Sequence, residues 1–318
     1  MGPFSHEAVL YSGEDGFLTG VLPFVTDGLR AGEQVLAAVP ESRVAALRSA
    51  LGSDAYDYGV GGAVEIGPVR VELRDMTQIG HNPSRIIPWV LRAFIDQHPG
   101  QAVRIVGDSM WAGRSALEYP ACVQHEALIN LAFAADRVTV LCPYDTALLA
   151  PSMLADIDRT HPTLMSGGQR RPSQTYTSPE SVLAALNLPL DEPAEPSPAL
   201  SFDVGDLGMV RDFVADHGRR AGLSLERIAD LQLAANEIAT NSVKHGGGRG
   251  TLRIWKADGA VVCEIRDAGS ITDPLVGRVP PNADSDRGRG LLLVNFLCDL
   301  VRIHTGSEGT AVRLYLNC

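Results

Sequence analysis

Apolar residues in the front half of the chain alternate between short continuous runs and runs at helical spacing. The run at 8–11 predicts a strand, and the apolar positions spaced along 17–29 predict the helix that follows it. Strands are also predicted at 34–39, 64–66, 102–107 and 138–142, and helices at 42–51, 83–98 and 119–134. Strands that alternate with helices predict a mostly parallel, doubly wound sheet.

Proline changes the pattern from about residue 165, with seven prolines from Pro162 to Pro198. Such a stretch cannot bury enough apolar area to fold by itself, so a semi-rigid linker is predicted, preceded by a short helix at 181–186. We therefore expect a first domain over residues 1–185, a linker over 186–200 and a second domain over 201–318.

The second domain has a different order of elements. Helical spacing predicts an amphipathic helix around 207–214 and a longer one at 225–244. Two strands follow, joined at Asp258-Gly259, a strong signal for a two-residue hairpin turn, with Leu252 and Ile254 facing inward. An apolar helix and a closing hairpin are predicted after them, at 290–297, 301–304 and 310–316.

Polar residues gather on one side of the longer helix. At about 100° per residue, Asn241, Lys244 and His245 fall within about 80° of Glu237, while the opposite arc is apolar. A carboxylate can accept a proton, an amide oxygen suits a hydrated divalent cation, and an amine suits a phosphate. A solvated helix face is the simpler interpretation of this spacing taken alone.

Three glycine-containing turns follow the polar helix. Asp267-Ala268-Gly269 ends a predicted strand, Gly288-Arg289-Gly290 opens a helix, and Gly309-Thr310 opens the last strand. Each is ordinary as an isolated turn. Gly288 and Gly290 also place free backbone N–H groups at a helix N-terminus, which favours the oxygens of a triphosphate.

Length and composition narrow the functional classes. The 318 residues suffice for two domains, and the net charge is −11, of which residues 1–200 carry −10. This balance argues against a nucleic-acid partner and favours protein or nucleotide ligands. No apolar run approaches the roughly 20 residues that span a bilayer and no signal peptide is apparent, so we expect a cytoplasmic protein without membrane contact. Five cysteines in mostly apolar segments indicate reduced thiols.

The front half offers little sign of catalysis. The loop at 12–16 lacks the lysine of a Walker-type phosphate loop and carries two carboxylates where phosphate would lie, so nucleotide hydrolysis is not expected there. Cys122, His125 and Cys142 could suggest a metal site. Because the first two share a helix and only one further thiol is near, packing in the core is the stronger interpretation.

Several short sequence segments of the front half resemble the MEDS sensory domain, and the resemblance extends over about residues 5–180. They are 6–11, Gly113-Arg114-Ser115, 125–130 and Leu141-Cys142-Pro143-Tyr144-Asp145. The resemblance implies a RecA/KaiC-like fold without its ATPase machinery and a role in sensing small molecules. It makes four residues candidates for a ligand pocket, although capping and strand-end hydrogen bonds explain each one singly: His6, Tyr11, Glu126 and Asp145.

The order of motifs in the back half resembles the N, G1, G2 and G3 boxes of the GHKL (Bergerat-fold) ATPases over about residues 200–318. The resemblance implies an α/β sandwich that binds ATP and Mg²⁺. Glu237 would be the general base, Asn241 the Mg²⁺ ligand, and Asp267 the acceptor for the adenine amino group. The remaining nucleotide-binding positions would be Lys244 and His245 near the phosphates, Gly269 beside the ring, Gly288, Arg289 and Gly290 at the triphosphate, and Thr310 in support of Asp267.

Within that superfamily the chain is most similar to anti-sigma-factor serine kinases of the RsbW type. The similarity rests on Asn236-Glu237, on the phrase at 241–246 and on the short loop at 270–287. The two domains together resemble the RsbA family of anti-sigma regulators, which implies a STAS anti-anti-sigma protein or a sigma factor as partner, and a homodimer. One departure is Ile271 in place of the second glycine of D-x-G-x-G, which stiffens that turn.

Three functions follow from these patterns. The first is a regulator that binds ATP and Mg²⁺ and either sequesters a sigma factor or phosphorylates a serine or threonine of a STAS protein. The second is a histidine kinase, which needs a phosphoacceptor histidine on a dimerising helix where this chain has its proline-rich segment. The third is a non-catalytic binding module that Ile271 would favour. The signal, the partner and the oligomeric state stay open.

Overall fold

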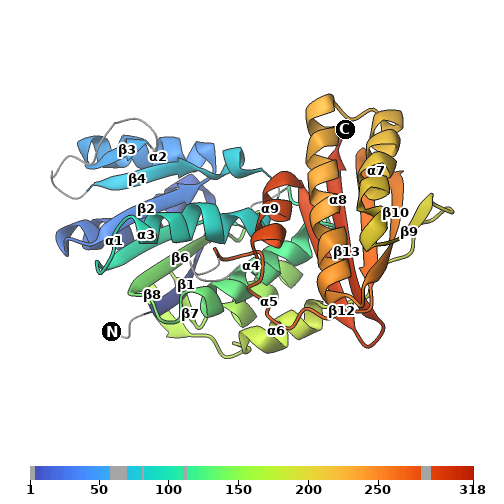
Figure 1. Ribbon diagram of the computed structural model, residues 1–318. Helices are drawn as coiled ribbons and strands as arrows, with labels where there is room; N and C mark the ends of the chain where they lie inside the picture. The colour runs from blue at the N-terminus through green and yellow to red at the C-terminus, as the bar shows by residue number, and fades with distance from the viewer. Residues whose placement is uncertain (1–3, 58–69, 81, 110–112, 281–287) are drawn as a thin grey trace. The chain divides into compact units, whose positions relative to one another are not determined.

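The computed structural model describes residues 4–57, 70–80, 82–109, 113–280 and 288–318. These residues form two compact units, Met1–Leu183 and Ala184–Cys318, each built on a sheet of its own (Figure 1). The strand predicted at 64–66 lies outside the described residues.

The sheet of the first unit has eight strands within the described residues, in the order β3-β4-β2-β5-β6-β1-β7-β8. Every neighbouring pair is parallel except β7 and β8, so the predicted mostly parallel sheet is confirmed. The strands are β1 (Phe4–Tyr11), β2 (Gln34–Val39), β3 (Ala55–Asp57), β4 (Val71–Asp75), β5 (Val103–Gly107), β6 (Val138–Asp145), β7 (Thr163–Ser166) and β8 (Gln169–Pro172).

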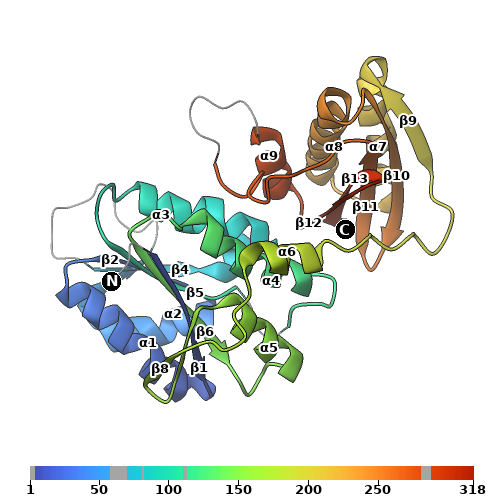
Figure 2. The same cartoon turned by 90° about the horizontal axis from the view of Figure 1, so that it is seen from below.

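Helices cover both faces of this sheet (Figure 2). On one face Phe17 and Val21 of the first helix pack against Val9, Val35 and Leu141 of the strands in one core. The opposite face includes His6, Cys142 and the helix that carries Glu126. The helices are α1 (Gly13–Arg30), α2 (Glu41–Leu51), α3 (Ala93–Asp96), α4 (Tyr119–Ala132), α5 (Pro151–Thr160) and α6 (Pro179–Leu186), with the 3-10 turns η1 (Gly52–Asp54), η2 (Met76–Ile79) and η3 (Pro83–Arg85).

The helix predicted over 83–98 is not one regular α-helix. A 3-10 turn, the π-helical segment η4 (Ile87–Arg92) and a single turn of α-helix succeed one another. Pro88 lies inside this run and has no N–H to donate, so the regular ladder of hydrogen bonds cannot pass through it. The hairpin β7–β8 was also not predicted, because it falls where the proline-rich composition begins.

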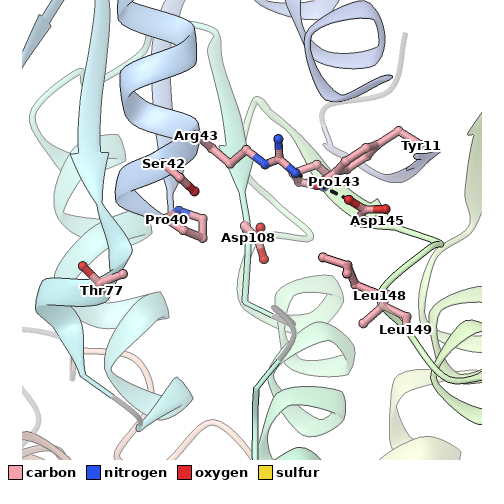
Figure 3. Close-up of a pocket in the computed structure, with 10 residues that line it drawn as sticks. All are labelled: Tyr11, Pro40, Ser42, Arg43, Thr77, Asp108, Pro143, Asp145, Leu148 and Leu149. Atoms are coloured by element: carbon pink, nitrogen blue, oxygen red, sulfur yellow. Dashed lines mark hydrogen bonds and ion pairs between the residues drawn. The ribbon is translucent and has the colours of Figure 1, made fainter. Parts of the chain in front are cut away.

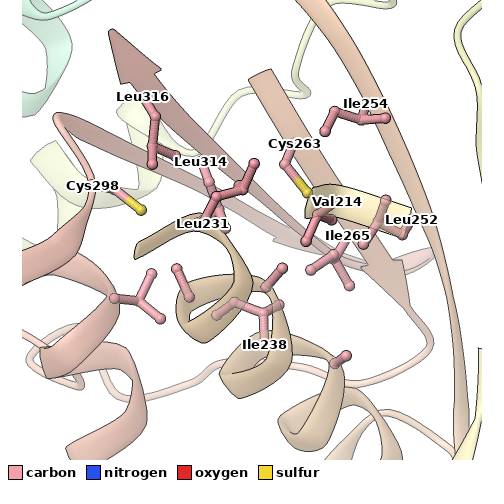
Figure 4. Packing of buried hydrophobic residues seen from close by; sticks show 14 of the residues in the cluster. Val214, Leu231, Ile238, Leu252, Ile254, Cys263, Ile265, Cys298, Leu314 and Leu316 are labelled. Carbon is pink, nitrogen blue, oxygen red and sulfur yellow. The ribbon is translucent and has the colours of Figure 1, made fainter. Parts of the chain in front are cut away.

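The second unit is an antiparallel sheet covered on one face by helices. Its strand order is β12-β13-β11-β10-β9. Leu231 and Ile238 of the long helix lie beside Cys263 and Ile265 of the central strand, within one apolar core (Figure 4). The strands are β9 (Ala199–Asp203), β10 (Arg249–Ala257), β11 (Ala260–Asp267), β12 (Leu300–Gly306) and β13 (Gly309–Asn317), and the helical elements are η5 (Val204–Asp206), α7 (Leu207–Ala221), α8 (Leu225–His245) and α9 (Arg289–Leu297).

The predicted hairpin turn is present between β10 and β11. Asp258 and Gly259 have φ values of 49° and 80°, the left-handed conformation that a tight two-residue turn requires. Leu252 and Ile254 are buried, as expected from the alternation along the strand. Leu225, which the helical pattern placed on the apolar arc, is instead 82% exposed because it occupies the first turn of α8.

The proline-rich segment is bound to the second unit. The Asn187 side chain donates to the Thr305 carbonyl at 2.7 Å and accepts from the Thr305 N–H at 3.1 Å. Glu192 pairs with Arg253 and Arg266, whose strand neighbours point into the core, so the segment crosses the sheet face opposite the helices. We call residues 187–198 the strap.

No helix in the described ranges combines the length and the apolar character needed to cross a bilayer.

Candidate functional site

Helix α8 carries the polar stripe that the sequence predicted. Ser224 caps its N-terminus by accepting from the Arg227 N–H at 3.2 Å, and Glu226 lies in the first turn, where the helix dipole favours negative charge. After its C-cap at Gly246 the chain leaves through Gly247 and Gly248, both with positive φ. The buried arc holds the helix against the sheet and leaves the polar side facing α9.

Glu237 and Asn241 lie one turn apart on α8 and face the start of α9. A Cβ at Gly290 would lie 2.6 Å from Glu237 Oε2 and 3.7 Å from Asn241 Nδ2, so the glycine lets the Glu237 carboxylate lie against the start of α9 without shifting. With the described residues, the side chains of Glu237 and Asn241 form no hydrogen bond or ion pair. The first N–H groups of a helix have no partner within it, and they carry partial positive charge. A carboxylate, an amide and a helix N-terminus therefore meet here.

Asp267 is fixed at the other end of the polar stripe. The Ser242 hydroxyl donates to its Oδ2 at 2.6 Å, and the Gly269 N–H donates to its Oδ1 at 2.8 Å. A Cβ at Gly246 would lie 2.4 Å from Asp267 Cγ, so the carboxylate fits against α8 only because Gly246 has no side chain. Since Ser242 directly follows Asn241, the Asp267 end and the Gly290 end of the site lie close together along α8.

Thr310 stabilises the turn that follows Asp267. Its hydroxyl donates to the Gly269 carbonyl at 2.9 Å and contacts the Thr305 hydroxyl at 3.0 Å. The predicted support of Asp267 therefore does not run from hydroxyl to carboxylate; Thr310 pairs with Asp267 only as its neighbour across β11 and β13. The structure places the other predicted residues as follows: Lys244 and His245 are exposed on the last turn of α8, Gly288 is the N-cap of α9, and Arg289 is exposed in its first turn.

Two contributors to this site were missed from sequence. Ser242 falls on the buried side of α8, where a lone hydroxyl among apolar residues was the only signal. Gly246 entered the sequence analysis only as part of the segment 241–246, whereas in the structure it makes room for the Asp267 carboxylate. Neither role can be recognised until the partner strand is known.

The loop after the first glycine turn is anchored on both sides. The Ile271 N–H donates to the Thr305 hydroxyl at 3.2 Å, and its side chain packs against the core. Farther along, the Asn295 side chain donates to the Gly277 carbonyl at 2.9 Å. Arg278 is 8% exposed, and burial lowers its pKa to about 10. The residue that replaces the expected glycine thus fastens the start of this loop to the β12–β13 hairpin.

The first unit has a pocket of about 250 Å³ at the carboxyl ends of its parallel strands (Figure 3). Tyr11 and Asp145 line it, and Arg43 lies 3.5 Å from Asp145 and 5.5 Å from the centre of the Tyr11 ring. Burial, together with the nearby Asp108, raises the pKa of Tyr11 to about 12. This edge is where open α/β sheets bind ligands.

The other two pocket candidates, His6 and Glu126, do not line this pocket. They are fully buried together with Cys142, and burial lowers the pKa of His6 to about 4. Cys122 is a separate buried thiol, in agreement with the core role expected for it, and burial raises its pKa to about 12. None of the five cysteines, all within the described ranges, forms a disulfide.

Two protein families match the chain. The MEDS family (MEthanogen/methylotroph, DcmR Sensory domain) matches residues 5–162, and the histidine kinase-like ATPase domain family matches residues 200–316. Among solved structures, the RsbU and RsbW domains of Rv1364c from Mycobacterium tuberculosis are similar at 23% identity with a TM-score of 0.29, over 38% of this chain and 33% of that chain. The match thus spans about a third of that structure, and no curated protein matches. The chain consists of a MEDS sensory domain followed by a member of the histidine kinase-like ATPase domain family.

Proposed function

We propose that this chain is an ATP-binding anti-sigma regulator whose ATPase domain acts on a protein partner under the control of the sensory domain. The observation that carries the proposal is the meeting of Glu237 and Asn241 with the start of α9 at Gly290, close along α8 to the fixed carboxylate of Asp267. Few structural roles would need an unpaired carboxylate and amide opposite a glycine-opened helix.

The residues present fit ATP and Mg²⁺. Asn241 offers an amide oxygen to the metal, the α9 N-terminus and Lys244 suit phosphate oxygens, and Asp267 suits an amino group of the base. The missing side chain at Gly290 lets the Glu237 carboxylate lie beside the N-terminus of α9, where the phosphates would bind. When bound, the nucleotide supplies the phosphoryl group and the metal offsets its charge.

The chain's own groups then have separate tasks. Glu237 would orient an acceptor hydroxyl or take its proton, and the N–H groups of α9 would stabilise negative charge that develops nearby. Ser242 keeps the Asp267 carboxylate in one orientation, which favours one register of the base. These tasks need no further catalytic residue, so Glu237 is the group whose loss should separate binding from transfer.

A serine or threonine of a STAS anti-anti-sigma protein is the proposed acceptor, and a sigma factor the proposed sequestered partner. These partners are supported by the RsbW-like sequence motif around Glu237 and by the sensory domain that precedes the ATPase domain. A histidine kinase is less favoured, because residues 184–200 contain no histidine and the strap within them lies on the sheet instead of forming a dimerising helix.

Nucleotide titrations test the binding half of the proposal. Asn241→Ala should abolish the magnesium dependence of ATP affinity, and Asp267→Asn should weaken ATP more than the triphosphate of another base. Gln232→Ala, also on α8 and hydrogen-bonded only to the Arg211 carbonyl, is the control and should bind as wild type does. Equal ATP affinity of the wild type and all three variants would show that ATP does not bind at this site.

Labelled ATP and a purified STAS anti-anti-sigma protein test the catalytic half. Transfer by the wild type that is lost in Glu237→Ala and Glu237→Gln, with ATP affinity retained, supports the kinase. Transfer that persists in Glu237→Ala excludes this residue from the mechanism. ATP binding without transfer in the wild type would favour the non-catalytic module, for which the packing of the Ile271 side chain against the core is the supporting observation.

A further inference from the structure

Four side chains with metal-binding atoms meet inside the sensory domain. His6 comes from β1, Cys142 from the adjacent strand β6, Glu126 from α4, and His161 from the end of α5. All four are buried, and the side chains of His6, Glu126 and His161 have no exposed surface. Distant segments thus bring two imidazoles, a thiol and a carboxylate to one enclosed point, which we call the His-Cys-Glu cluster.

The spacing of these atoms is that of a tetrahedral metal site. His6 Nε2 lies 3.4 Å from both Cys142 Sγ and Glu126 Oε2. Glu126 Oε2 lies 3.5 Å from Cys142 Sγ and 3.5 Å from His161 Nε2, and all the ligand atoms are within 4.8 Å of one another. Four of the six edges are thus 3.4–3.5 Å, and a regular tetrahedron with edges of that length has its centre about 2.1 Å from each corner, within the range of about 2.0–2.3 Å for zinc bonds to nitrogen, oxygen and sulfur. The other two edges, from His161 to His6 and to Cys142, are at most 4.8 Å.

Hydrogen bonds on the far side of each imidazole set its tautomer. Asn130 donates its amide to the carbonyls of Glu126 and Thr160, which turns its Oδ1 toward His6 Nδ1 at 3.2 Å. His161 Nδ1 lies 2.9 Å from the Ile157 carbonyl. Each Nδ1 must therefore carry a hydrogen, and when the ring is neutral its Nε2 presents a lone pair to the cluster, as metal-binding histidines do.

With both imidazoles neutral, the His-Cys-Glu cluster has more hydrogen-bond acceptors than donated hydrogens. The two Nε2 lone pairs and Glu126 Oε2 face one another, whereas among the described residues only the Cys142 thiol and the Tyr144 hydroxyl can donate. The other carboxylate oxygen, Oε1, is held by the Ser109 hydroxyl. Acceptors pointed at one another in a buried site are costly unless a cation lies between them.

We propose that the His-Cys-Glu cluster binds one divalent transition-metal ion, with His6, Glu126, Cys142 and His161 as its ligands. Two neutral imidazoles, one thiolate and one carboxylate neutralise a 2+ ion, which suits a site closed to water. The thiol gives its proton to solvent when the ion binds. Mixed nitrogen, sulfur and oxygen ligands in a tetrahedron favour Zn²⁺ over Mg²⁺ or Ca²⁺, which prefer oxygen.

The cluster is joined to the ligand pocket through neighbouring residues. Asp108 lines the pocket and the next residue, Ser109, holds Glu126. On β6, Cys142 and Tyr144 turn to the cluster while Pro143 and Asp145 line the pocket. The proposed ion would therefore fix the same strand ends that form the pocket.

Metal content of the full chain tests the proposal. The protein is expressed with added Zn²⁺, desalted after treatment with chelator, and analysed by mass spectrometry for metal per chain. We expect one equivalent in the wild type and its loss in Cys142→Ala and His161→Ala. Cys122→Ala removes an equally buried thiol on α4, outside the cluster, and should keep the metal.

The absorption spectrum of bound Co²⁺ reports the ligands of the ion and does not depend on the stability of the protein. Wild type refolded with Co²⁺ should show the visible bands of a tetrahedral ion and a thiolate-to-cobalt absorption, and Cys142→Ser should lose the second while keeping its circular dichroism. Asn130→Ala, which frees the His6 ring, should lower zinc affinity by about 10–100-fold. A wild type without stoichiometric zinc or cobalt, or a Cys142→Ala variant that holds metal as wild type does, would overturn the proposal and leave a proton shared within the cluster.

Discussion

Two glycines are as important to the ATPase-domain site as its polar side chains. Gly246 and Gly290 each occupy a position where a Cβ would come within 2.6 Å of an acidic side chain of the site. Sequence reasoning identified the glycine of α9 as a source of free N–H groups, but not as the residue that lets α9 approach Glu237. Close approach depends on two segments at once, so it has no local signature.

Gly290→Ala should weaken ATP binding, because the added methyl meets Glu237 Oε2 and must displace either the carboxylate or α9. Overpacking of a core costs about 1–3 kcal/mol, and because the half-buried Glu237 side chain can move, the low end of about 1 kcal/mol, or about 5-fold in nucleotide affinity, is expected. Calorimetric titration measures it. Gly208→Ala in α7 is the control, since its methyl would meet only Arg211 Nη2 at 3.8 Å and should leave affinity unchanged.

Ser242→Ala should lower both stability and nucleotide affinity. The hydroxyl is a donor to Asp267 Oδ2, and leaving a half-buried carboxylate oxygen without it costs about 1–3 kcal/mol. Urea unfolding and ATP titration of the same samples measure the two effects. Ser181→Ala, which removes only a surface bond to Ser178, should change neither; wild-type affinity in Ser242→Ala would mean that Asp267 is positioned by Gly269 alone.

Among the elements, the sheet of the second unit has a charged cluster on the face away from its helices. Glu264 of β11 is fully buried and accepts from Arg253 at 2.5 Å, Arg266 at 2.7 Å and Arg313 at 2.6 Å. The strap closes it, since Glu192 pairs with two of the same arginines. No pattern in the sequence singled out Glu264, because the three arginines that surround it come from three different strands.

Glu264→Gln should destabilise the second unit by about 3–5 kcal/mol, because it leaves clustered guanidinium groups without their counter-charge. Burial alone would raise the pKa of Glu264, but hydrogen bonds from Arg253 and Arg313 outweigh it and hold the pKa below its ordinary value. A lowered pKa in the folded state stabilises above the unfolded pKa, and this contribution is lost as pH falls through the folded value. The gap between wild type and variant in urea unfolding should therefore shrink on acidification; a gap independent of pH would contradict it.

The strap connects to the turn that follows Asp267 through one threonine. Asn187 makes two hydrogen bonds to the Thr305 backbone, and the Thr305 hydroxyl contacts Thr310 and accepts from the Ile271 N–H. Asn187→Ala should accelerate hydrogen exchange at the Thr305 and Ile271 amides and weaken ATP binding. Asn317→Ala, at the exposed end of β13, should do neither. Unchanged exchange at Ile271 in Asn187→Ala would show that the strap does not reach the site.

For the whole molecule, the periodicity of the chain predicted two kinds of sheet, and both are found. Parallel strands of the first unit appear as continuous apolar runs because they are buried on both faces, and strands of the second alternate because helices cover one face. Residues 58–69 and 281–287 lie outside the described structure, so the strand predicted at 64–66 and the end of the loop before Gly288 stay predictions. Hairpin β7–β8 was missed because composition near residue 165 resembles a linker.

The chain's sequence by itself determined what depends on near neighbours: the helical face of Glu237 and Asn241, the Asp258-Gly259 turn and the glycines that open α9. Only the tertiary structure decided which distant residues meet. Cys142 lies 136 residues from His6, and Asp267 lies 25 residues from Ser242, yet each pair is in contact. Spacing along the chain encodes the period of an element, whereas the order and register in which strands pair arise from the packing of the whole core.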